Sequence, residues 1–500
     1  MKNIKNYFKN SKLIFFYLLM FIVFIGVFLR IKYLGNDSYW LDEGFTLMQG
    51  RGVVNHGYPL LDSGWIEWKD LLMPYLIAPF IKLFSLQNSF ILRLPAVIFG
   101  VASIMVGYYL ARQLFSRLTA LMFATFLSLG YWYIAWSQQV RGYSALVFFV
   151  LLFFYFLIKY SKQASNKYLW LAFFTIILAT LLKTFGALLL APFLFYLFKN
   201  KKYKILLLIA LPTIPVMFLA RNKISNIFNL QGELHFAFYI KQYLLHYFSV
   251  VSILGWFGLI ASFLNDKKNR IIHGSILTFM LGALIIFSTM VIVTEGRYLL
   301  MITPFLFLYT AYFIEYLTKN LEHKTTATIL IFLIVLFSSF IFDHNILLFP
   351  QKHYELETGT PQPNYKQAYG AIKKNGFKKE DIIVSGNSMM DLIYLDKVDY
   401  TIRWSLTGRK GDDMFKNGQD MYTGAQKLYS RDGRGGIEKI KKLQHKFNVY
   451  VVLDSLALHR MNPQLREDII HSNGQVIFKE KGRNGIVVYF FKHTPKNASF

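Results

Sequence analysis

The chain has 500 residues, of which 54% are hydrophobic and 18% aromatic, and it carries a formal net charge of +27. This composition is more apolar than soluble domains usually are, and the apolar residues form runs of about 20, long enough to cross a bilayer. The cations stand in short clusters between these runs, which indicates cytoplasmic loops and excludes a nucleic-acid-binding surface as the reason for the charge. Because there is no cysteine, disulfides and thiolate metal sites are excluded as well.

The apolar runs predict a polytopic α-helical membrane protein with about eleven transmembrane helices. The first run follows a basic segment and has no small-residue cleavage site after it, so we expect a retained signal anchor. With a cytoplasmic N-terminus, nearly all cation clusters fall on the cytoplasmic side, and the odd number of spans leaves the C-terminus outside. The spans are expected near residues 13–34, 91–111, 118–136, 142–158, 168–182, 184–198, 205–220, 248–264, 271–293, 298–317 and 325–342.

Two outer loops are too long to be plain turns. The first, 35–90, contains the apolar stretch 71–84, which has two prolines and is too short to cross, so we expect it to lie at the membrane surface. The loop 221–247 mixes aromatic residues with histidines and is a second candidate for an interfacial helix.

The composition turns polar near residue 343, which divides the chain into a membrane domain, 1–342, and a C-terminal domain, 343–500. Helices that alternate with apolar strands predict a small extracytoplasmic α/β domain, with a long loop at 405–436. The expected elements are helices at 367–376 and 462–474, strands at 381–386 and 448–454, and a hairpin at 475–491 that turns at Asn484-Gly485.

Acidic residues are concentrated on the first outer loop. Of eleven acidic side chains before residue 343, six lie between the first span and residue 70. Ionisable groups near the membrane often mark a functional site, although a polar loop can also simply carry charge. Asp42 and Glu43, in "SYWLDEGF", stand among apolar and aromatic neighbours that would remove water from a carboxylate, which favours a role as a base.

Three cations are expected on the same outer face. Arg141, in "QQVRGY", and Arg297, in "TEGRYL", each stand at the mouth of a helix, and Lys183 lies within "LLKTFGALLLAP". Arginine binds phosphate through two hydrogen bonds and lysine through a point charge, so these residues are candidate ligands of an anionic lipid headgroup. The alternative for each is an interfacial side chain that extends towards water.

The order of these motifs resembles the GT-C membrane glycosyltransferases, in the branch that contains protein O-mannosyltransferases and bacterial aminoarabinose transferases. The resemblance covers the organisation of residues 10–342, and it is carried by the Asp-Glu pair, "ILRLPAVIFG", "QQVRGYSAL" and "GRYLLMITPFLFLY". It implies an inverting transfer of a sugar from a polyprenyl-phosphate carrier to an acceptor glycan, lipid or protein. It also implies that this transfer takes place at the outer face of a bacterial plasma (inner) membrane.

The resemblance also suggests roles for individual residues. Asp42 matches the proposed base, with Glu43 beside it, and Arg297, Arg141 and Lys183 would hold the donor phosphate. Lys69 matches a phosphate-contacting lysine of some members, except that Asp70 stands where those members have proline. No cofactor is required, but some members use an acidic residue and a histidine for zinc. Here the candidates for a divalent metal are Glu67 with His235 or His246.

Two alternatives from the sequence are a lipid-linked glycan transporter or flippase, and an O-antigen-type polymerase or ligase. A transporter is expected to show related halves and polar residues near the membrane midplane. This sequence shows no repeat, and its polar residues gather on the outer face. A polymerase or ligase usually carries its catalytic loop between later spans, so the early Asp-Glu loop favours the glycosyltransferase.

Overall fold

The computed structural model forms two compact units, and each is described by itself. We call residues 1–32, 96–138 and 142–349 the helical unit, and residues 33–95, 139–141 and 350–500 the α/β unit. The first outer loop therefore belongs to the same unit as the C-terminal domain. The structure describes residues 2–205, 207, 235–247, 249–289, 295–338, 363–402, 415–416, 419–420, 422–428, 435–454, 457–458, 461, 463–480 and 485–495.

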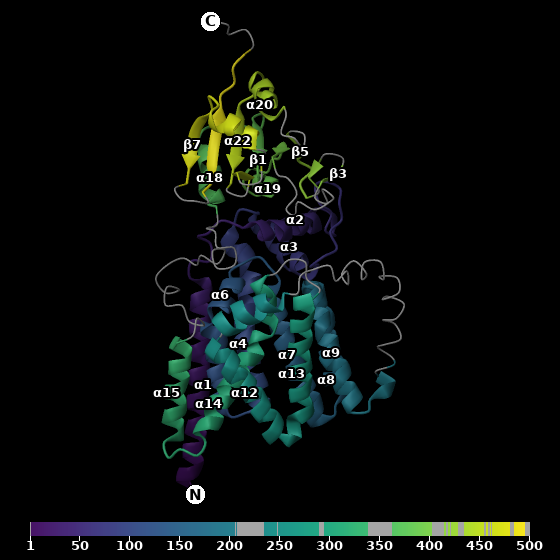
Figure 1. Ribbon diagram of the computed structural model, residues 1–500, viewed down its shortest axis with the longest axis vertical. Coiled ribbons are helices and arrows are strands. Elements are labelled where there is room, and N and C mark those ends of the chain that lie inside the picture. Colours follow the sequence, from purple (N-terminus) through teal and green to yellow (C-terminus); the bar gives the residue numbers. More distant parts are fainter. Residues whose placement is uncertain are drawn as a thin grey trace. The chain divides into compact units, whose positions relative to one another are not determined.

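The helical unit consists of long apolar helices packed side by side (Figure 1). Direct contacts join α7 to α8, α12 to α14, α13 to α9, and both α1 and α14 to α5. The described helices are α1 (Lys2–Ile31), α4 (Ser89–Leu114, which begins in the α/β unit), α5 (Arg117–Leu129), α6 (Tyr131–Ser137), α7 (Tyr143–Gln163), α8 (Asn166–Leu182), η1 (Thr184–Leu189), α9 (Leu190–Lys199), η2 (Phe238–Tyr247), α12 (Ser249–Asn265), η3 (Lys267–Asn269), α13 (Arg270–Thr289), η4 (Gly296–Met301), α14 (Thr303–Thr318) and α15 (Lys324–Ser338).

Four of these helices are long and apolar enough to cross a membrane, or five when α5 and α6 count as one bent span, within the described part of the chain. Further apolar helices, such as α8, α12 and α15, are shorter. Helices occupy the positions of the expected spans except for 205–220, which lies mostly outside the described residues. The protein is thus a multi-pass membrane protein, while the expected count of eleven spans stays a prediction.

The expected span 118–136 is bent by 53° between α5 and α6. A buried arginine of α1 supports this bend: Arg30 donates to the carbonyl oxygens of Leu127 at 2.8 Å and Ser128 at 3.1 Å, and to Oγ of Ser137 at 3.2 Å. The last carbonyls of a helix lack partners within it and carry partial negative charge, which explains why a cation is placed there. Hydropathy cannot reveal this arrangement, because it averages over the bend.

The α/β unit contains an eight-stranded mixed sheet in the order β3-β4-β5-β2-β1-β6-β8-β7 (Figure 1). The central strands β1 and β6 are parallel, with Ile382 paired to Val449, and β8 and β7 continue the sheet in antiparallel order. The strands are β1 (Ile382–Ser385), β2 (Tyr400–Thr401), β3 (Phe415–Lys416), β4 (Gln419–Asp420), β5 (Gln426–Lys427), β6 (Val449–Leu453), β7 (Gln475–Lys479) and β8 (Val487–Phe491).

Helices cover both faces of this sheet. Because side chains alternate along a strand, Val449, Val451 and Leu453 share one face, where they pack in one core with Ile440 of α20 and Leu465 of α22. The other face carries α18 and α19. The helices are α18 (Tyr365–Lys374), α19 (Ser388–Leu395), α20 (Gly436–Gln444) and α22 (Pro463–Ile470).

The expected helices 367–376 and 462–474 correspond to α18 and α22, the expected strands to β1 and β6, and the expected hairpin to β7 and β8. Asn484 of the hairpin turn lies outside the described residues. Within 405–436, expected as a loop, the described residues form β3, β4, β5 and the start of α20. Two-residue strands are too short to show a hydrophobic period, so the sequence did not indicate them.

Two helices of the first outer loop complete the α/β unit: α2 (Leu41–His56) and α3 (Leu72–Phe84), which lie side by side (Figure 1). Gly57 ends α2 with a φ of +81°, a conformation that glycine adopts without strain. The helix α3 has the position expected of the interfacial stretch 71–84. The sequence thus located α3 but did not indicate α2. The apolar residues of α2 do not recur at the spacing of one helix face, so no helical pattern is visible there.

Candidate active site

The Asp-Glu pair lies in the first turn of α2, and the two carboxylates have different surroundings. Consecutive residues of a helix point about 100° apart, so one of the pair can be buried while the other faces outward. The side chain of Glu43 is 1% exposed, whereas that of Asp42 is 19% exposed. Both carboxylates lie at the positive end of the helix dipole, where negative charge is stabilised.

Glu43 forms a buried ion pair with Arg93 of α4. Nε and Nη2 of Arg93 donate to the two carboxylate oxygens of Glu43, each at 2.9 Å. The same carboxylate accepts from the backbone N–H groups of Trp40 at 3.2 Å and Val140 at 2.8 Å. Glu43 thus ties together the start of α2, the start of α4 and the segment 139–141.

The remaining donors of Arg93 are also used. Nη1 donates to the carbonyl oxygens of Leu34 at 2.8 Å and Asp37 at 3.2 Å, and Nη2 donates to that of Ser38 at 3.1 Å. Arg93 therefore holds the chain that leads from α1 into α2. A buried arginine with this set of partners fixes backbone geometry, which places Asp42 at a defined position.

Asp42 is paired with Arg141. Nη2 of Arg141 lies 3.6 Å from Oδ2 of Asp42 and 3.9 Å from Oδ2 of Asp70. Nη1 donates to the backbone oxygen of Asp42 at 2.9 Å and to Oγ1 of Thr46 at 3.0 Å. One guanidinium thus orients Asp42 and stands between two carboxylates.

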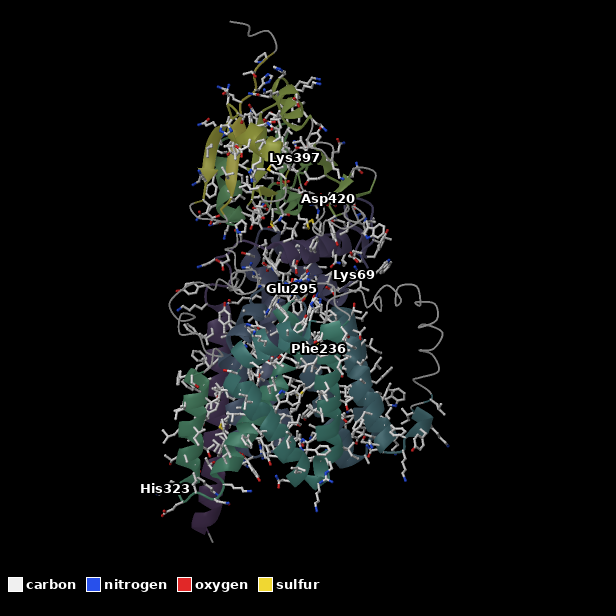
Figure 2. All side chains as sticks on the ribbon, in the orientation of Figure 1. Lys69, Phe236, Glu295, His323, Lys397 and Asp420 are labelled. Carbon is white, nitrogen blue, oxygen red and sulfur yellow. The ribbon has the colours of Figure 1, made fainter. Side chains whose placement is uncertain are left out.

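Lys69 and Glu67 lie beside this group on the first outer loop. The backbone oxygen of Lys69 accepts from Nε2 of Gln49, on α2, at 3.1 Å, while the Lys69 side chain is exposed (labelled in Figure 2). Glu67 accepts from the backbone N–H of Lys69 at 3.1 Å and from Oη of Tyr422 at 3.3 Å. The structure therefore brings together Asp42, Arg141, Lys69 and Glu67 of the expected site, with Asp70 and Tyr422 added.

The other two expected phosphate ligands, Arg297 and Lys183, share an aromatic cluster in the helical unit. The guanidinium of Arg297 lies 5.7 Å from the ring centre of Trp136 and 5.9 Å from that of Tyr143, and Nζ of Lys183 lies 4.8 Å from the Tyr143 ring. Arg297 is also paired with Glu295 at 3.3 Å. Aromatic faces attract cations, so the Tyr143 ring brings two positive charges near each other.

Both cations of this cluster are largely withdrawn from water, since the side chain of Arg297 is 11% exposed and Lys183 is 5% exposed. Lys183 ends α8, where its main chain accepts from the N–H of Gly186 at 2.7 Å. Arg297 lies in η4, just before α14. Cations in such a poorly hydrated place interact strongly with an anion.

The structure does not bring the candidate metal ligands together within the residues that it describes. Among the residues that the structure describes, no group of three His, Asp or Glu side chains is close enough together to hold a metal ion. Glu67 belongs to the α/β unit, His235 belongs to the helical unit, and the side chain of His246 lies outside the described residues.

Three residues with important contacts were not singled out from the sequence: Arg93, Glu295 and Tyr422, while Asp70 was indicated only as one of the clustered carboxylates. Arg93 lies within "ILRLPAVIFG", and an arginine in an otherwise apolar stretch is a signal for a buried partner. Asp70 follows Lys69 directly, and Glu295 stands two positions before Arg297. Tyr422 had no signal, because its contacts come from residues more than 350 positions away.

Known proteins share this fold. Residues 69–221 match the family of dolichyl-phosphate-mannose-protein mannosyltransferases. The oligosaccharyltransferase AglB from Archaeoglobus fulgidus, in complex with an inhibitory peptide and a dolichol-phosphate, is 13% identical, with a TM-score of 0.60 over 97% of this chain and 75% of AglB. A search of curated protein sequences finds no match.

ArnT from Cupriavidus metallidurans is similar over nearly its whole length. Its apo structure is 12% identical with a TM-score of 0.60, and its complex with undecaprenyl phosphate is 13% identical with a TM-score of 0.58. Both matches cover 94% of this chain and 97% of ArnT. ArnT and AglB are members of the GT-C superfamily, so the chain has the GT-C fold. The expected resemblance to mannosyltransferases and ArnT is thereby confirmed.

Proposed function

We propose that this protein is an inverting glycosyltransferase that moves a sugar from a polyprenyl-phosphate donor to an acceptor at the outer face of a bacterial plasma membrane. The GT-C fold and the match to the mannosyltransferase family support the class of reaction. The observation that carries the proposal within this chain is the Asp42–Arg141–Asp70 group at the start of α2. The N-terminus is cytoplasmic in this proposal, and the C-terminal domain is extracytoplasmic.

Asp42 acts as the general base in this reaction. The acceptor hydroxyl attacks the anomeric carbon of the donor, and its proton passes to Oδ of Asp42. The bond between the anomeric carbon and the phosphate oxygen breaks, and its electron pair leaves with the polyprenyl phosphate. Arg141 orients Asp42, because it contacts both the side chain and the backbone oxygen of that residue.

Arg297 and Lys183 stabilise the departing phosphate. A phosphate monoester of low pKa needs no proton from a general acid, but negative charge grows on its oxygens as the bond breaks. Both cations lie near the same ring, that of Tyr143, and this proximity supports a shared role in holding one phosphate. Lys69, whose side chain is exposed, is a further candidate for the same phosphate. Glu43 has a positioning role in this proposal, since Arg93 and two backbone N–H groups occupy its carboxylate.

A transfer assay on purified protein in lipid vesicles tests this function. A panel of polyprenyl-phosphate sugars is supplied, and loss of donor is followed for the wild type, Arg297→Ala and Arg270→Ala. We expect consumption of one donor, a decrease of about 10²-fold to 10³-fold for Arg297→Ala, and wild-type rates for Arg270→Ala, whose side chain is exposed and contacts the carbonyls that end α12. Movement of labelled lipid across the bilayer without donor consumption would instead identify a flippase.

A further inference from the structure

One face of α2 bears Asp42, Phe45, Thr46 and Gln49, at the spacing that brings helix residues onto one side. Each of these side chains meets a group from another segment. Arg141 contacts Asp42 and Thr46, and the backbone of Lys69 accepts from Gln49. Phe45 meets Tyr422, with ring centres 4.4 Å apart. A residue of the C-terminal domain therefore lies one helical turn from the candidate base.

The segment that carries Tyr422 is firmly held. Oδ1 of Asp420 (labelled in Figure 2) accepts from the backbone N–H groups of Tyr422 at 2.9 Å and Thr423 at 3.0 Å. Oγ1 of Thr423 also donates to Oγ of Ser388 at 2.9 Å. Asp420 and Thr423 are buried, whereas Tyr422 is only partly buried. These hydrogen bonds hold the backbone of Tyr422 and Thr423, and the ring of Tyr422 packs against Phe45 of α2.

Tyr422 also contacts the first outer loop. Its Oη donates to Oε2 of Glu67 at 3.3 Å. A carboxylate offers about four lone-pair positions, and Glu67 uses one for Tyr422 and one for the N–H of Lys69, so it can still accept from a ligand hydroxyl. On either side of Glu67 along this loop, Trp65 is 42% exposed and Trp68 is 63% exposed.

We propose that Phe45, Tyr422 and Glu67 form the acceptor subsite and that the acceptor is a saccharide. The inference rests on the proposed function and adds the substrate class to it. Aromatic rings stack on the C–H faces of a pyranose, and a carboxylate beside them accepts hydrogen bonds from its hydroxyls. Trp65 and Trp68 extend the aromatic surface for further sugar units. The oxygens of Glu67 act as acceptors towards Tyr422 and Lys69, so the hydroxyl groups of a ligand suit them better than anionic groups do.

The first test is a binding measurement that does not depend on transfer. The full chain in lipid nanodiscs is exposed to neutral oligosaccharides and, separately, to Ser/Thr-containing peptides, and saturation-transfer NMR reports which protons contact the protein. We expect oligosaccharides to bind through their C–H faces, with at least tenfold weaker binding for Tyr422→Ala and Glu67→Gln. Tyr75→Phe is the matched control, because this hydroxyl donates to Gly57 at the opposite end of α2 and its loss should leave binding unchanged.

Binding of peptides but not of oligosaccharides would overturn the proposal, as would oligosaccharide binding that both variants leave unchanged. The role in transfer is tested separately in the vesicle assay. Tyr422→Phe and Phe45→Leu are expected to raise KM for the saccharide acceptor at least tenfold while KM for the donor stays unchanged. A loss of stability alone would lower the amount of active enzyme, but it would not raise KM for the acceptor while leaving KM for the donor unchanged. If the wild type consumes no donor but binds saccharides through these residues, the proposed function and the role as an acceptor subsite both fail, and only a saccharide-binding site is left.

Discussion

At the scale of single residues, the adjacent carboxylates of Asp42 and Glu43 have different partners. Glu43 is enclosed by Arg93 and two backbone N–H groups, whereas Asp42 is partly exposed and has one guanidinium beside it. A buried carboxylate with four donors holds structure together, and it has little freedom to exchange a proton with a substrate. These surroundings agree with the proposal that Asp42 is the base and Glu43 a positioning residue, the order that the family resemblance implies.

Replacement of Glu43 by glutamine should destabilise the protein strongly. The change leaves the charge of Arg93 buried without its ion-pair partner, which costs about 3–5 kcal/mol in comparable sites. Thermal unfolding of the purified protein, followed by intrinsic fluorescence, is the measurement. Glu380→Gln is the control, since Glu380 pairs with Lys378 at 3.9 Å on an exposed surface, where such a pair contributes little. Equal melting temperatures for the two variants would contradict the structural role of Glu43.

At the scale of elements, α2 is positioned by close packing at its glycines. A Cβ atom at Gly52 would lie 2.3 Å from the backbone oxygen of Leu60, and one at Gly50 would lie 2.7 Å from the end of the Ile81 side chain. The first contact is with backbone and cannot be relieved by a rotamer change. The loop that carries Glu67 and Lys69 therefore approaches α2 as closely as it does only because residue 52 has no side chain.

Gly52→Ala should push this loop away from α2 and so disturb the candidate active site. We expect a lower melting temperature and a transfer rate reduced at least tenfold, because Asp70 and Lys69 would shift relative to Asp42. Gly370→Ala, in α18, is the matched control, since nothing lies within 4 Å of its added Cβ and alanine favours a helix. A Gly52→Ala variant with wild-type stability and rate would show that the loop does not need this contact.

The helix α19 has a buried carboxyl on its inner side. Burial raises the pKa of Asp391 to about 7, and repulsion from Asp399 and Asp454 adds to this, while hydrogen bonds from Ser385 and Tyr369 act in the opposite direction. Oη of Tyr369 donates to Asp391 at 2.5 Å. The neighbouring residues of α19, Met389 and Met390, pack against Gly44 of α2. Asp391 therefore lies on a helix that contacts α2.

This raised pKa predicts a specific dependence of stability on pH. In the unfolded chain an aspartate titrates near pH 3.9, so between about pH 4 and pH 7 the folded protein binds more protons than the unfolded one. The stability that neutral Asp391 provides is complete below about pH 4 and is lost as the pH rises through about 7.

The melting temperatures of the wild type and Asp391→Asn, compared from about pH 5 to pH 8, test this expectation. We expect the wild type to lose stability relative to the variant as the pH rises. Asp468→Asn, on the partly exposed surface of α22, serves as the control and should show a constant difference. A constant difference for Asp391→Asn as well would mean that Asp391 is not buried in the neutral form.

At the scale of the whole molecule, the sequence predicted helices and strands better than it predicted their assembly. Long apolar runs located the long helices, and short continuous apolar runs located β1, β6 and β8, because each of these signals lies within one element. The joining of residues 33–95 and 350–500 in one unit has no such signal. It depends on single contacts between distant residues, such as the ion pair of Arg51 with Asp396 at 3.1 Å.

The candidate site shows the same limit. The sequence indicated Asp42 and Arg141 by their charge and position and Lys69 by the family resemblance, and the structure brings them together in the α/β unit. The partners that decide what each of these can do, Arg93 for Glu43 and Tyr422 for Glu67, come from other parts of the chain. Burial and pairing are properties of the fold, so the sequence could not show that Glu43 is enclosed by Arg93 and backbone N–H groups.

The most direct test of the central claim is the rate of donor consumption by Asp42→Asn in lipid vesicles, with the polyprenyl-phosphate sugar that the wild type uses. The change removes the base but keeps the shape of the side chain, so we predict a melting temperature near that of the wild type and a rate lower by about 10²-fold or more. Asp468→Asn, with the same chemical change on α22, should retain the wild-type rate. If Asp42→Asn consumes donor as fast as the wild type, Asp42 is not the base and the mechanism proposed for this protein is wrong.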